Sequence, residues 1–380
     1  MTERTAVIVG GGIGGLAAAL ALTRRGWQIE VCERVAEFTE IGAGLSLWPN
    51  ALWALAALDL DGRVRELGAV EVGGGVRNRA GRWLARTDNA EIERRFGMPL
   101  VVLHRADLLR ALVDALPAET LRPSTTVTAI HDDGDSVVVE DGVRSRRVDL
   151  VIGADGLHST VRRLRWPAAK PPRYVGYTAW RMITRPLPDP LTEGAATWGR
   201  GERFGFTSMP GGRVYCFATA TVPAGGSTPG GELAELHRRF GTWAEPIPTL
   251  LAAVPDEGVF RHDIYDLPPL PGYTCGRVAL LGDAAHAMTP NLGQGACQVL
   301  EDAVVLAACL DQHPDLGTGL AHYDQLRRSR TQQVVRRSAR LGSVGQLAWP
   351  PAAIARDLAA RLTPGSLTLR SMAPILGWRP

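Results

Sequence analysis

The sequence predicts a mixed α/β protein in which a Rossmann-like parallel sheet flanked by helices is interrupted by an antiparallel sheet and followed by C-terminal helices. Three observations support this fold class. A glycine-rich turn joins a short apolar strand to a helix near the N-terminus, and two later apolar segments each end in a glycine and an aspartate. Between residues 171 and 271, strand-like pieces alternate with turns before the buried-strand pattern returns. The first domain is therefore expected to be discontinuous.

The composition is that of an ordinary globular chain. Its 380 residues are 45% hydrophobic and 21% charged, and the formal net charge is only +3. A charge this small and dispersed argues against a nucleic-acid-binding protein. The five cysteines form no C-x-x-C pair, which favours a reducing compartment and no metal site. Without a signal peptide or an apolar run of about 18 residues, we expect a cytoplasmic protein with no membrane span.

The N-terminal segment predicts a strand over 5–9, a helix over 16–25 and a second strand over 28–32. The turn between the first two follows the pattern of a dinucleotide-binding motif, with one glycine for the tight turn, one for close approach of backbone to a pyrophosphate, and one for helix packing. The residues concerned are Gly10, Gly12, Ile13, Gly14 and Gly15.

The second strand ends at Glu33, eighteen residues after Gly15, and Arg34 follows it. A carboxylate at this place can accept a hydrogen bond from a ribose 2′-hydroxyl, and it would repel a 2′-phosphate. The tightly held ligand is therefore expected to be FAD or NAD rather than NADP.

Two further strands, 150–153 and 278–281, deliver similar motifs. The first ends in Asp155-Gly156, with Ser159 as a helix cap and Arg162 in the first helical turn. By itself this motif is equally consistent with an ordinary strand–turn–helix junction. The second ends in Gly282-Asp283, where an aspartate can hold a polyol hydroxyl.

The stretch from Pro290 to Gly295 opens a helix over 295–310 whose free N–H groups would face an anion. Two nearby residues are interpreted as structural: His286 as a buried histidine rather than a metal ligand, and Cys297 as a packing residue rather than a redox thiol. Strands over 101–103 and 127–130 and a helix over 106–116 complete this part of the chain.

The middle segment predicts strands over 177–184, 202–209 and 213–222 and a helix over 232–240. The turn Pro210-Gly-Gly212 is expected to be a type I turn followed by a left-handed Gly212. This loop sets Thr207 opposite Tyr215 and Arg203 near Thr219. Arg203 and Tyr215 then share a sheet face, where they could bind a substrate oxyanion, while Gly205 leaves room for the aromatic ring of the substrate. The alternative is a solvated Arg203 and a core Tyr215.

A long helix over 318–346 carries six arginines between Arg327 and Arg340, which we interpret as a solvated helix face.

Together, the glycine-rich turn and the Asp155-Gly156 and Gly282-Asp283 motifs resemble the single-component FAD-dependent aromatic hydroxylases, the group related to p-hydroxybenzoate and salicylate hydroxylase. The stretch Glu40-Ile-Gly-Ala-Gly44 and Arg105 resemble this family too, and the pair Arg203 and Tyr215 is similar to its urate hydroxylase branch. We expect an FAD-binding domain over 1–72, 97–172 and 272–317, and a substrate-binding β-sheet domain over 73–96 and 173–271. A C-terminal helical segment would cover 318–380.

The resemblance implies site residues. On the substrate side they are Arg203, Tyr215, Arg181 beside the flavin, and the Pro290 carbonyl. On the FAD side they are the residues of the glycine-rich turn together with Glu33, Arg34, Gly44, Arg105, Val127, Asp155, Asp283, Pro290, Gly293, Gly295 and Ala296.

The resemblance also implies the reaction. NAD(P)H reduces FAD, O₂ adds to form a flavin C4a-hydroperoxide, and one oxygen passes to a small electron-rich aromatic or heteroaromatic substrate. The chain has no second dinucleotide motif, no G-x-S-x-G elbow and no W-x-W-x-I-P halogenase motif. A flavin dehydrogenase or reductase on the same scaffold, and a non-enzymatic flavin-binding regulator, stay open as alternatives, as does a homo-oligomer. Substrate-stimulated NAD(P)H oxidation coupled to hydroxylation would separate them.

Overall fold

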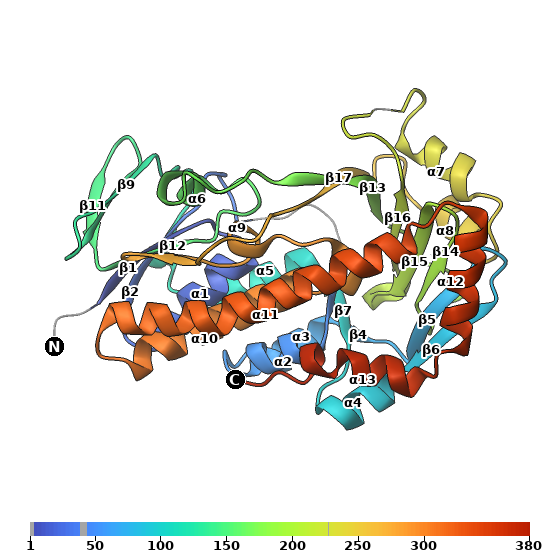
Figure 1. Ribbon diagram of the computed structural model, residues 1–380, viewed down its shortest axis with the longest axis horizontal. Helices are drawn as coiled ribbons and strands as arrows, with labels where there is room; N and C mark the ends of the chain where they lie inside the picture. The colour runs from blue at the N-terminus through green and yellow to red at the C-terminus, as the bar shows by residue number, and fades with distance from the viewer. Residues whose placement is uncertain (1–3, 39–43, 227) are drawn as a thin grey trace.

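The computed structural model describes residues 4–38, 44–226 and 228–380 and contains the expected mixed α/β architecture (Figure 1). Its first sheet has the strand order β18-β19-β12-β1-β2-β8, and all of its pairs except β18 with β19 are parallel. Because the carboxyl ends of parallel strands meet at one edge, the loops after β1, β2, β12 and β19 converge there. The strands are β1 (Thr5–Val9), β2 (Gln28–Cys32), β8 (Leu121–Arg122), β12 (Leu150–Gly153), β18 (Thr274–Cys275) and β19 (Val278–Leu280).

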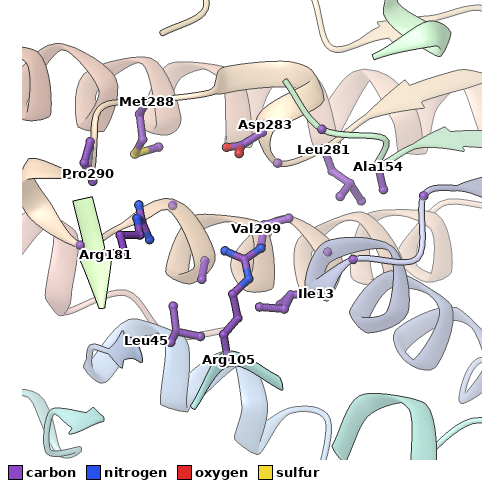
Figure 2. A pocket seen from close by; sticks show the side chains of 18 of the residues that line it. Ile13, Leu45, Arg105, Ala154, Arg181, Leu281, Asp283, Met288, Pro290 and Val299 are labelled. Atoms are coloured by element: carbon purple, nitrogen blue, oxygen red, sulfur yellow. The ribbon is translucent and has the colours of Figure 1, made fainter. Parts of the chain in front are cut away.

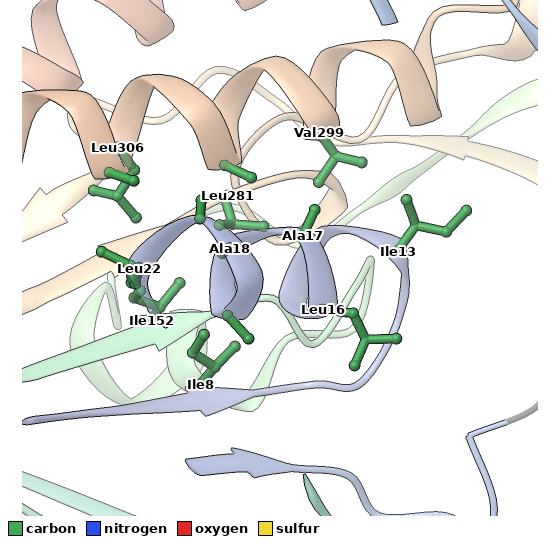
Figure 3. Packing of buried hydrophobic residues seen from close by; sticks show 14 of the residues in the cluster. Ile8, Ile13, Leu16, Ala17, Ala18, Leu22, Ile152, Leu281, Val299 and Leu306 are labelled. Carbon is green, nitrogen blue, oxygen red and sulfur yellow. The ribbon is translucent and has the colours of Figure 1, made fainter. Parts of the chain in front are cut away.

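Helix α1 (Ile13–Thr23) lies between this sheet and helix α10 (Gly295–Gln312). Figure 3 shows its small side chains sandwiched between Ile8 and Ile152 of the sheet and Val299 and Leu306 of α10. Helices α1 and α10 approach each other so closely at Gly14 that only a glycine fits. A Cβ added to Gly14 would lie only 2.2 Å from Val299 Cγ2. The alanine-rich sequence of α1 thus permits the two helices that carry cofactor-side residues to pack directly together.

The second sheet has seven strands in the order β17-β13-β16-β15-β14-β5-β6, antiparallel except for β14 with β5. Helices α7 (Glu232–Phe240) and α8 (Ile247–Ala252) contribute to a core on this sheet that includes Phe204, Phe240 and Trp243. The strands are β5 (Gly73–Asn78), β6 (Trp83–Asp88), β13 (Arg173–Ile183), β14 (Ala195–Trp198), β15 (Glu202–Ser208), β16 (Val214–Ala220) and β17 (Val259–Asp266).

The β15–β16 hairpin has the register that the sequence predicts. Thr207 pairs with Tyr215, Arg203 pairs with Thr219, and the Met209 amide donates to the Arg213 carbonyl. The predicted turn type is wrong, however. Both glycines of the loop are left-handed, with φ of 75° at Gly211 and 71° at Gly212, whereas a type I turn needs a negative φ at the first of them. Two adjacent glycines allow this because neither carries a Cβ.

Two small sheets hold the remaining strands, among them the two strands that the sequence predicted over 101–103 and 127–130. The strand expected over 101–103 is β7 (Val101–His104), which pairs antiparallel with β3 (Gly44–Leu47) and β4 (Ala69–Val70) outside the main sheet. The strand expected over 127–130 begins only at residue 129. The second small sheet comprises β9 (Ala129–Asp132), β10 (Val137–Glu140) and β11 (Ser145–Val148).

The remaining helices cover the sheets or link them. Helix α11 (Leu316–Gly345) runs from the first sheet to the second, and α12 (Pro350–Leu362) and α13 (Gly365–Leu376) follow beside β6 (Figure 1). None of the helices in the described ranges combines the length and apolar character needed to cross a bilayer. The others are α2 (Pro49–Ala56), α3 (Asp61–Leu67), α4 (Asn89–Phe96), α5 (Arg105–Asp114), α6 (Thr160–Arg165) and α9 (Asp283–His286), with short 3-10 turns over Ala118–Thr120, Pro210–Gly212 and Pro290–Leu292.

Candidate functional site

A cavity of about 690 Å³ extends from the carboxyl edge of the first sheet to the face of the second. Its size lies within the roughly 300–1,000 Å³ typical of small-molecule and cofactor sites. Figure 2 shows Ile13, Leu45 and Arg105 on one wall and Leu281, Asp283 and Met288 on the opposite wall. All the predicted site residues line this cavity except Gly15. Residues 40–43 of the predicted Glu40–Gly44 stretch lie outside the described ranges.

The glycine-rich turn forms the floor of the first half. Gly10 has a φ of 108°, and a Cβ there would lie 2.4 Å from the Ala154 carbonyl oxygen. Gly15 lies behind the cavity wall, where a Cβ would approach the Gly10 carbonyl oxygen to 1.9 Å. Gly15 therefore does not line the cavity itself, and the close packing that the sequence predicted for the third glycine is its role in the turn.

Glu33 lies at one end of this half, directly after β2. Its carboxylate accepts hydrogen bonds from the backbone amides of Gly11 at 2.6 Å and Val35 at 3.1 Å. These contacts fix the side chain, and a carboxylate keeps further lone pairs that can accept from a hydroxyl. Arg34 is exposed at the rim of the cavity.

The Asp155-Gly156 motif is held by helix caps. The Asp155 carboxylate accepts from the Thr160 amide at 2.6 Å, and the Ser159 hydroxyl accepts from the Arg162 amide at 2.9 Å, so the predicted cap at Ser159 is confirmed. Arg162 is buried and donates to the carbonyl of Ala284 at 2.8 Å. This bond ties the motif to α9 and hence to Gly282-Asp283, although the motifs are more than a hundred residues apart.

Arg105 and Asp283 approach each other across the cavity (Figure 2). Burial lowers the pKa of the Arg105 guanidinium, and the Asp283 carboxylate partly offsets that effect. A buried guanidinium beside a line of backbone amides is a suitable binding site for a phosphate group.

The N-terminus of α10 faces the middle of the cavity, where Gly293, Gly295 and Ala296 line the wall. The first intrahelical bond runs from the Gln298 amide to the Gln294 carbonyl at 2.8 Å. The amides of the preceding turn thus lack intrahelical acceptors and lie at the positive end of the helix dipole. A Cβ on Gly295 would meet no described atom within 4 Å, so open space adjoins it.

Beneath this N-terminus lies a buried ion network, and here the interpretation of the arginine cluster as a solvated face is wrong for Arg327. This residue is 1% exposed and donates to Asp302 at 2.6 Å and to Glu301 at 2.5 Å. His286 Nε2 lies 2.6 Å from the other Asp302 oxygen, which agrees with a structural role. The sequence around Arg327 gave no sign of this burial, because the burial depends on how α10 packs against α11.

Cys297 lies on the first turn of α10 and is fully buried. Burial raises the pKa of its thiol to about 12. A thiol that stays protonated is a poor nucleophile, which supports the interpretation of Cys297 as a packing residue.

The second sheet supplies the other half of the cavity, including Arg181, Arg203 and Tyr215. Arg203 and Tyr215 lie on one face of the sheet in the register that the sequence predicted, and both line the cavity. Because Arg203 pairs with Thr219, it lies four residues along the strand from Tyr215, about 13 Å away. The space beside Gly205 is filled by the Phe217 ring, to which a Cβ would come within 2.1 Å. Gly205 therefore makes room for Phe217 and not for a substrate ring.

Arg203 is buried without a carboxylate partner among the described residues. Its Nε donates to the Thr219 hydroxyl at 3.2 Å, and its guanidinium lies 5.5 Å from the centre of the Tyr177 ring. Burial lowers the pKa of this guanidinium. Gly345 at the end of α11 allows the close packing, since a Cβ there would lie 3.0 Å from the arginine.

Tyr215 lies at the cofactor end of this half. A Cβ on Gly44 would come within 2.3 Å of its ring, so the β3 backbone passes directly over it. Burial raises the pKa of the Tyr215 hydroxyl, an effect that the neighbouring Arg181 partly offsets. The structure thus joins Tyr215 with Arg181 rather than with Arg203.

Several lining residues escaped the sequence analysis. Thr125 and Thr126 follow β8 near Glu33, and the Thr125 amide donates to the Glu33 carbonyl at 2.8 Å. Val76 and Trp198 come from strands at the far side of the second sheet. No local motif marks these positions, because only the assembled strand order brings them to the cavity.

Comparison with known proteins identifies the family. The family model described as FAD binding domain matches residues 3–170 and 270–338. The aurachin C monooxygenase/isomerase of Stigmatella aurantiaca is 39% identical over 91% of this chain and 90% of its own length. The FAD-dependent urate hydroxylase of Klebsiella pneumoniae is 35% identical over 87% of each chain. The chain belongs to the FAD-binding family of single-component aromatic hydroxylases.

The solved structures agree with this family membership. The HpxO protein of Klebsiella pneumoniae, complexed with FAD and uric acid, has a TM-score of 0.91 and 31% sequence identity, and it covers 98% of this chain and 96% of its own. This protein is therefore an FAD-dependent monooxygenase, and the expected fold, enzyme class and cofactor are confirmed.

The first half of the cavity fits FAD on its own chemistry. The glycine turn lets backbone approach a pyrophosphate, and Arg105 supplies the cation opposite. Glu33 and Asp283 offer carboxylate oxygens for hydroxyl groups, and the α10 N-terminus offers amides for the electron-rich edge of a flavin.

Proposed function

We propose that this monooxygenase uses NAD(P)H and O₂ to hydroxylate a small electron-rich aromatic or heteroaromatic compound that carries an ionised oxygen. Arg203, Tyr215, Arg181 and the Pro290 carbonyl would handle the substrate, and the cofactor-side residues named above would hold FAD. In the domain division expected from the sequence, the substrate-binding domain would supply Arg181, Arg203 and Tyr215, and the FAD-binding domain would supply Pro290 and the cofactor-side residues. The five cysteines form no disulfide, which supports a location in the reducing cytoplasm.

The observation that carries this proposal is the buried guanidinium of Arg203. A buried charge is costly unless it is paired, and arginine cannot escape by losing its proton. The described residues around it offer a hydroxyl and an aromatic ring but no ion-pairing carboxylate. A substrate oxyanion would supply the missing negative charge, and it would make the ring more electron-rich.

FAD, when bound and reduced, supplies the activation of O₂ that monooxygenation requires. The residues of the chain itself bind and orient the substrate and exclude water from the site. Tyr215 keeps its proton at neutral pH because burial raises its pKa, so it can donate a hydrogen bond. The apolar residues Phe217, Met288 and Leu341 line the cavity and would keep water from the reacting groups.

The test is a screen of phenolic acids, hydroxylated heteroaromatics and purines for stimulated NAD(P)H oxidation by the FAD-loaded protein. We expect a substrate with an ionisable hydroxyl to stimulate oxidation and to yield a hydroxylated product. Formation of H₂O₂ alone with every such compound, or stimulation only by alcohols or amines that are dehydrogenated, would contradict the proposal.

A further inference from the structure

Helix α12 turns an apolar face to solvent. Ile354, Leu358 and Leu362 are 63%, 56% and 72% exposed and recur at the four-residue spacing that places side chains on one face of a helix. The exposed positions of this helix that continue the face are Pro351, Ala355 and Ala359. At 100° per residue these six positions span about 140° of the helix circumference. Soluble monomers rarely expose an apolar stripe of this kind without a binding role.

The opposite face fixes the orientation of α12. Arg356 points inward, where its Nη2 donates to the Gly199 carbonyl at 3.0 Å and its Nη1 to the Gly345 carbonyl at 3.2 Å. Its guanidinium also lies 5.0 Å from the centre of the Trp198 ring. Because the arginine holds one side of the helix against the protein, the leucine and isoleucine side chains must face outward.

Exposed apolar residues also flank α12 at both of its ends. Trp349, the residue before the helix, is 69% exposed, and Leu367 at the start of α13 is 50% exposed. Figure 1 shows α12 at the outer edge of the molecule, beside β5 and β6. A tryptophan next to an exposed apolar helix is typical of segments that lie at a membrane–water interface.

The charges around this patch are positive. Arg361 and Arg370 are exposed on α12 and α13, and Arg200 is exposed on the turn whose Gly201 amide donates to the Leu347 carbonyl. None of the three forms an ion pair within the described ranges. Two acids near the patch are already paired, Asp357 with Arg356 at 2.7 Å and Glu193 with Arg86.

These charges decide between two occupants of the patch. A twofold dimer built on α12 would gather the basic residues of two copies around one interface, and the like charges would oppose association. A bilayer containing anionic phospholipids would instead attract them, while the apolar stripe entered the boundary between headgroups and acyl chains.

We propose that α12 docks the protein on the surface of an anionic phospholipid membrane. Docking buries Ile354, Leu358 and Leu362 in the interface, with Trp349 at one end and the unpaired arginines against lipid phosphates. On the inward face of the same helix, Arg356 packs on Trp198 of β14, which lines the substrate half of the cavity, so α12 lies between the docked surface and this residue of the cavity wall.

The test is flotation of the FAD-loaded full chain with vesicles of phosphatidylcholine, alone or containing phosphatidylglycerol. We expect binding to the anionic vesicles that weakens as salt is raised. Leu358→Glu with Leu362→Glu should weaken that binding at least tenfold, because two apolar anchors are lost. Arg361→Glu, which leaves the apolar stripe intact, should weaken it about thirtyfold by reversing one charge near the phosphates.

Val143→Glu is the matched control, since Val143 is 90% exposed on the turn between β10 and β11, away from α12. Flavin absorbance and circular dichroism report that each variant is folded. No binding of the wild type to anionic vesicles would overturn the proposal, as would equal binding by the α12 and Val143 variants. A concentration-dependent dimer, measured by light scattering and abolished by the α12 substitutions, would assign the face to a second copy and overturn it too.

Discussion

Two arginines, one below the cofactor half of the cavity and one in the wall of the substrate half, are buried to a similar degree. They differ in how their charge is compensated. Arg327, under the cofactor half, is 1% exposed and forms ion pairs with Glu301 and Asp302, which raise its pKa against the effect of burial. Arg203, in the substrate half, is 7% exposed and has only neutral hydrogen-bonding partners within the described residues, and burial lowers its pKa.

The difference teaches that burial of a charge does not identify its role. A charge that the protein itself neutralises is part of the architecture, whereas one left without a counter-charge in a cavity wall is available to a ligand. Glu71 is an instructive third case. It is buried and has no cationic partner in the part of the chain that the structure describes, but it lies outside the cavity and can neutralise itself by protonation, which an arginine cannot do.

The largest effect is expected at Arg327. Arg327→Met leaves the Asp302 carboxylate buried with only His286 and a backbone amide, and the loss of a buried ion-pair partner costs about 3–5 kcal/mol of unfolding free energy. Urea unfolding of the FAD-free protein measures this. Arg328→Met is the control, because its partly exposed pair with Asp324 contributes at most about 1 kcal/mol. Equal effects of the two substitutions would mean that the network is not structural.

Gly295→Val sharpens the comparison in the cofactor half. The new side chain would extend into the open space beside the α10 N-terminus, so we expect FAD to bind roughly fivefold to 150-fold more weakly, or about 1–3 kcal/mol. The folded protein itself should be unaffected. Flavin fluorescence titration measures the affinity, and Gly62→Val, an unobstructed glycine of α3 away from the cavity, is the control. Unchanged FAD affinity would argue against the assigned flavin position.

A smaller effect is expected at Tyr215, whose hydroxyl pKa is influenced by the neighbouring Arg181. Tyr215→Phe removes one hydroxyl donor, worth about 1 kcal/mol or roughly fivefold in substrate affinity, and should leave FAD bound. Product formed per NAD(P)H oxidised should fall at the same time. Tyr174→Phe, on the same strand as Arg181 but outside the cavity, should change neither quantity. A Tyr215 variant with normal affinity and coupling would make that residue part of the core only.

The smallest effect is expected at Glu71, and it depends on pH. Its folded pKa is raised above the ordinary 4.5 because burial outweighs the hydrogen bond that its carboxylate accepts from the Ser208 amide. The folded state therefore keeps its proton longer, and stability falls as pH rises through the folded pKa. Glu71→Gln should be more stable than the wild type by up to about 1 kcal/mol at pH 7 and no more stable below pH 4.5.

Urea unfolding at several pH values measures the Glu71 effect. Glu66→Gln is the control, because Glu66 is an exposed residue of α3 whose pair with Arg63 is on the surface. A stability difference between wild type and Glu71→Gln that does not change with pH would show that ionisation of Glu71 is not its cause.

The sequence predicts the cofactor half well because its determinants are local. The turn from Gly10 to Gly15, the carboxylate of Glu33 and the helix start at Gly295 each depend on a few consecutive residues whose backbone geometry restricts the choice of side chain. Gly15, the glycine predicted for helix packing, does face a backbone atom, and only the folded turn shows that it lies outside the cavity wall.

The substrate half is less predictable because its determinants are distant in sequence. The hairpin register follows from the turn at Pro210, but the distance between Arg203 and Tyr215, the ring of Phe217 beside Gly205 and the burial of Arg203 under Gly345 depend on how β16, β15 and α11 pack together. For the same reason the burial of Arg327 and the outward apolar face of α12 become visible only in the assembled structure.

The central claim is that the charge of Arg203 is completed by the substrate, and one binding measurement tests it directly. Once the screen has identified a substrate, calorimetry on the FAD-loaded wild type and on Arg203→Met compares the ionised substrate with an analogue that lacks the ionisable group. The account predicts that the wild type prefers the ionised compound at least tenfold, that Arg203→Met loses this preference, and that the variant unfolds no more easily than the wild type. An equal loss of affinity for both compounds, or a preference that survives the substitution, would contradict it.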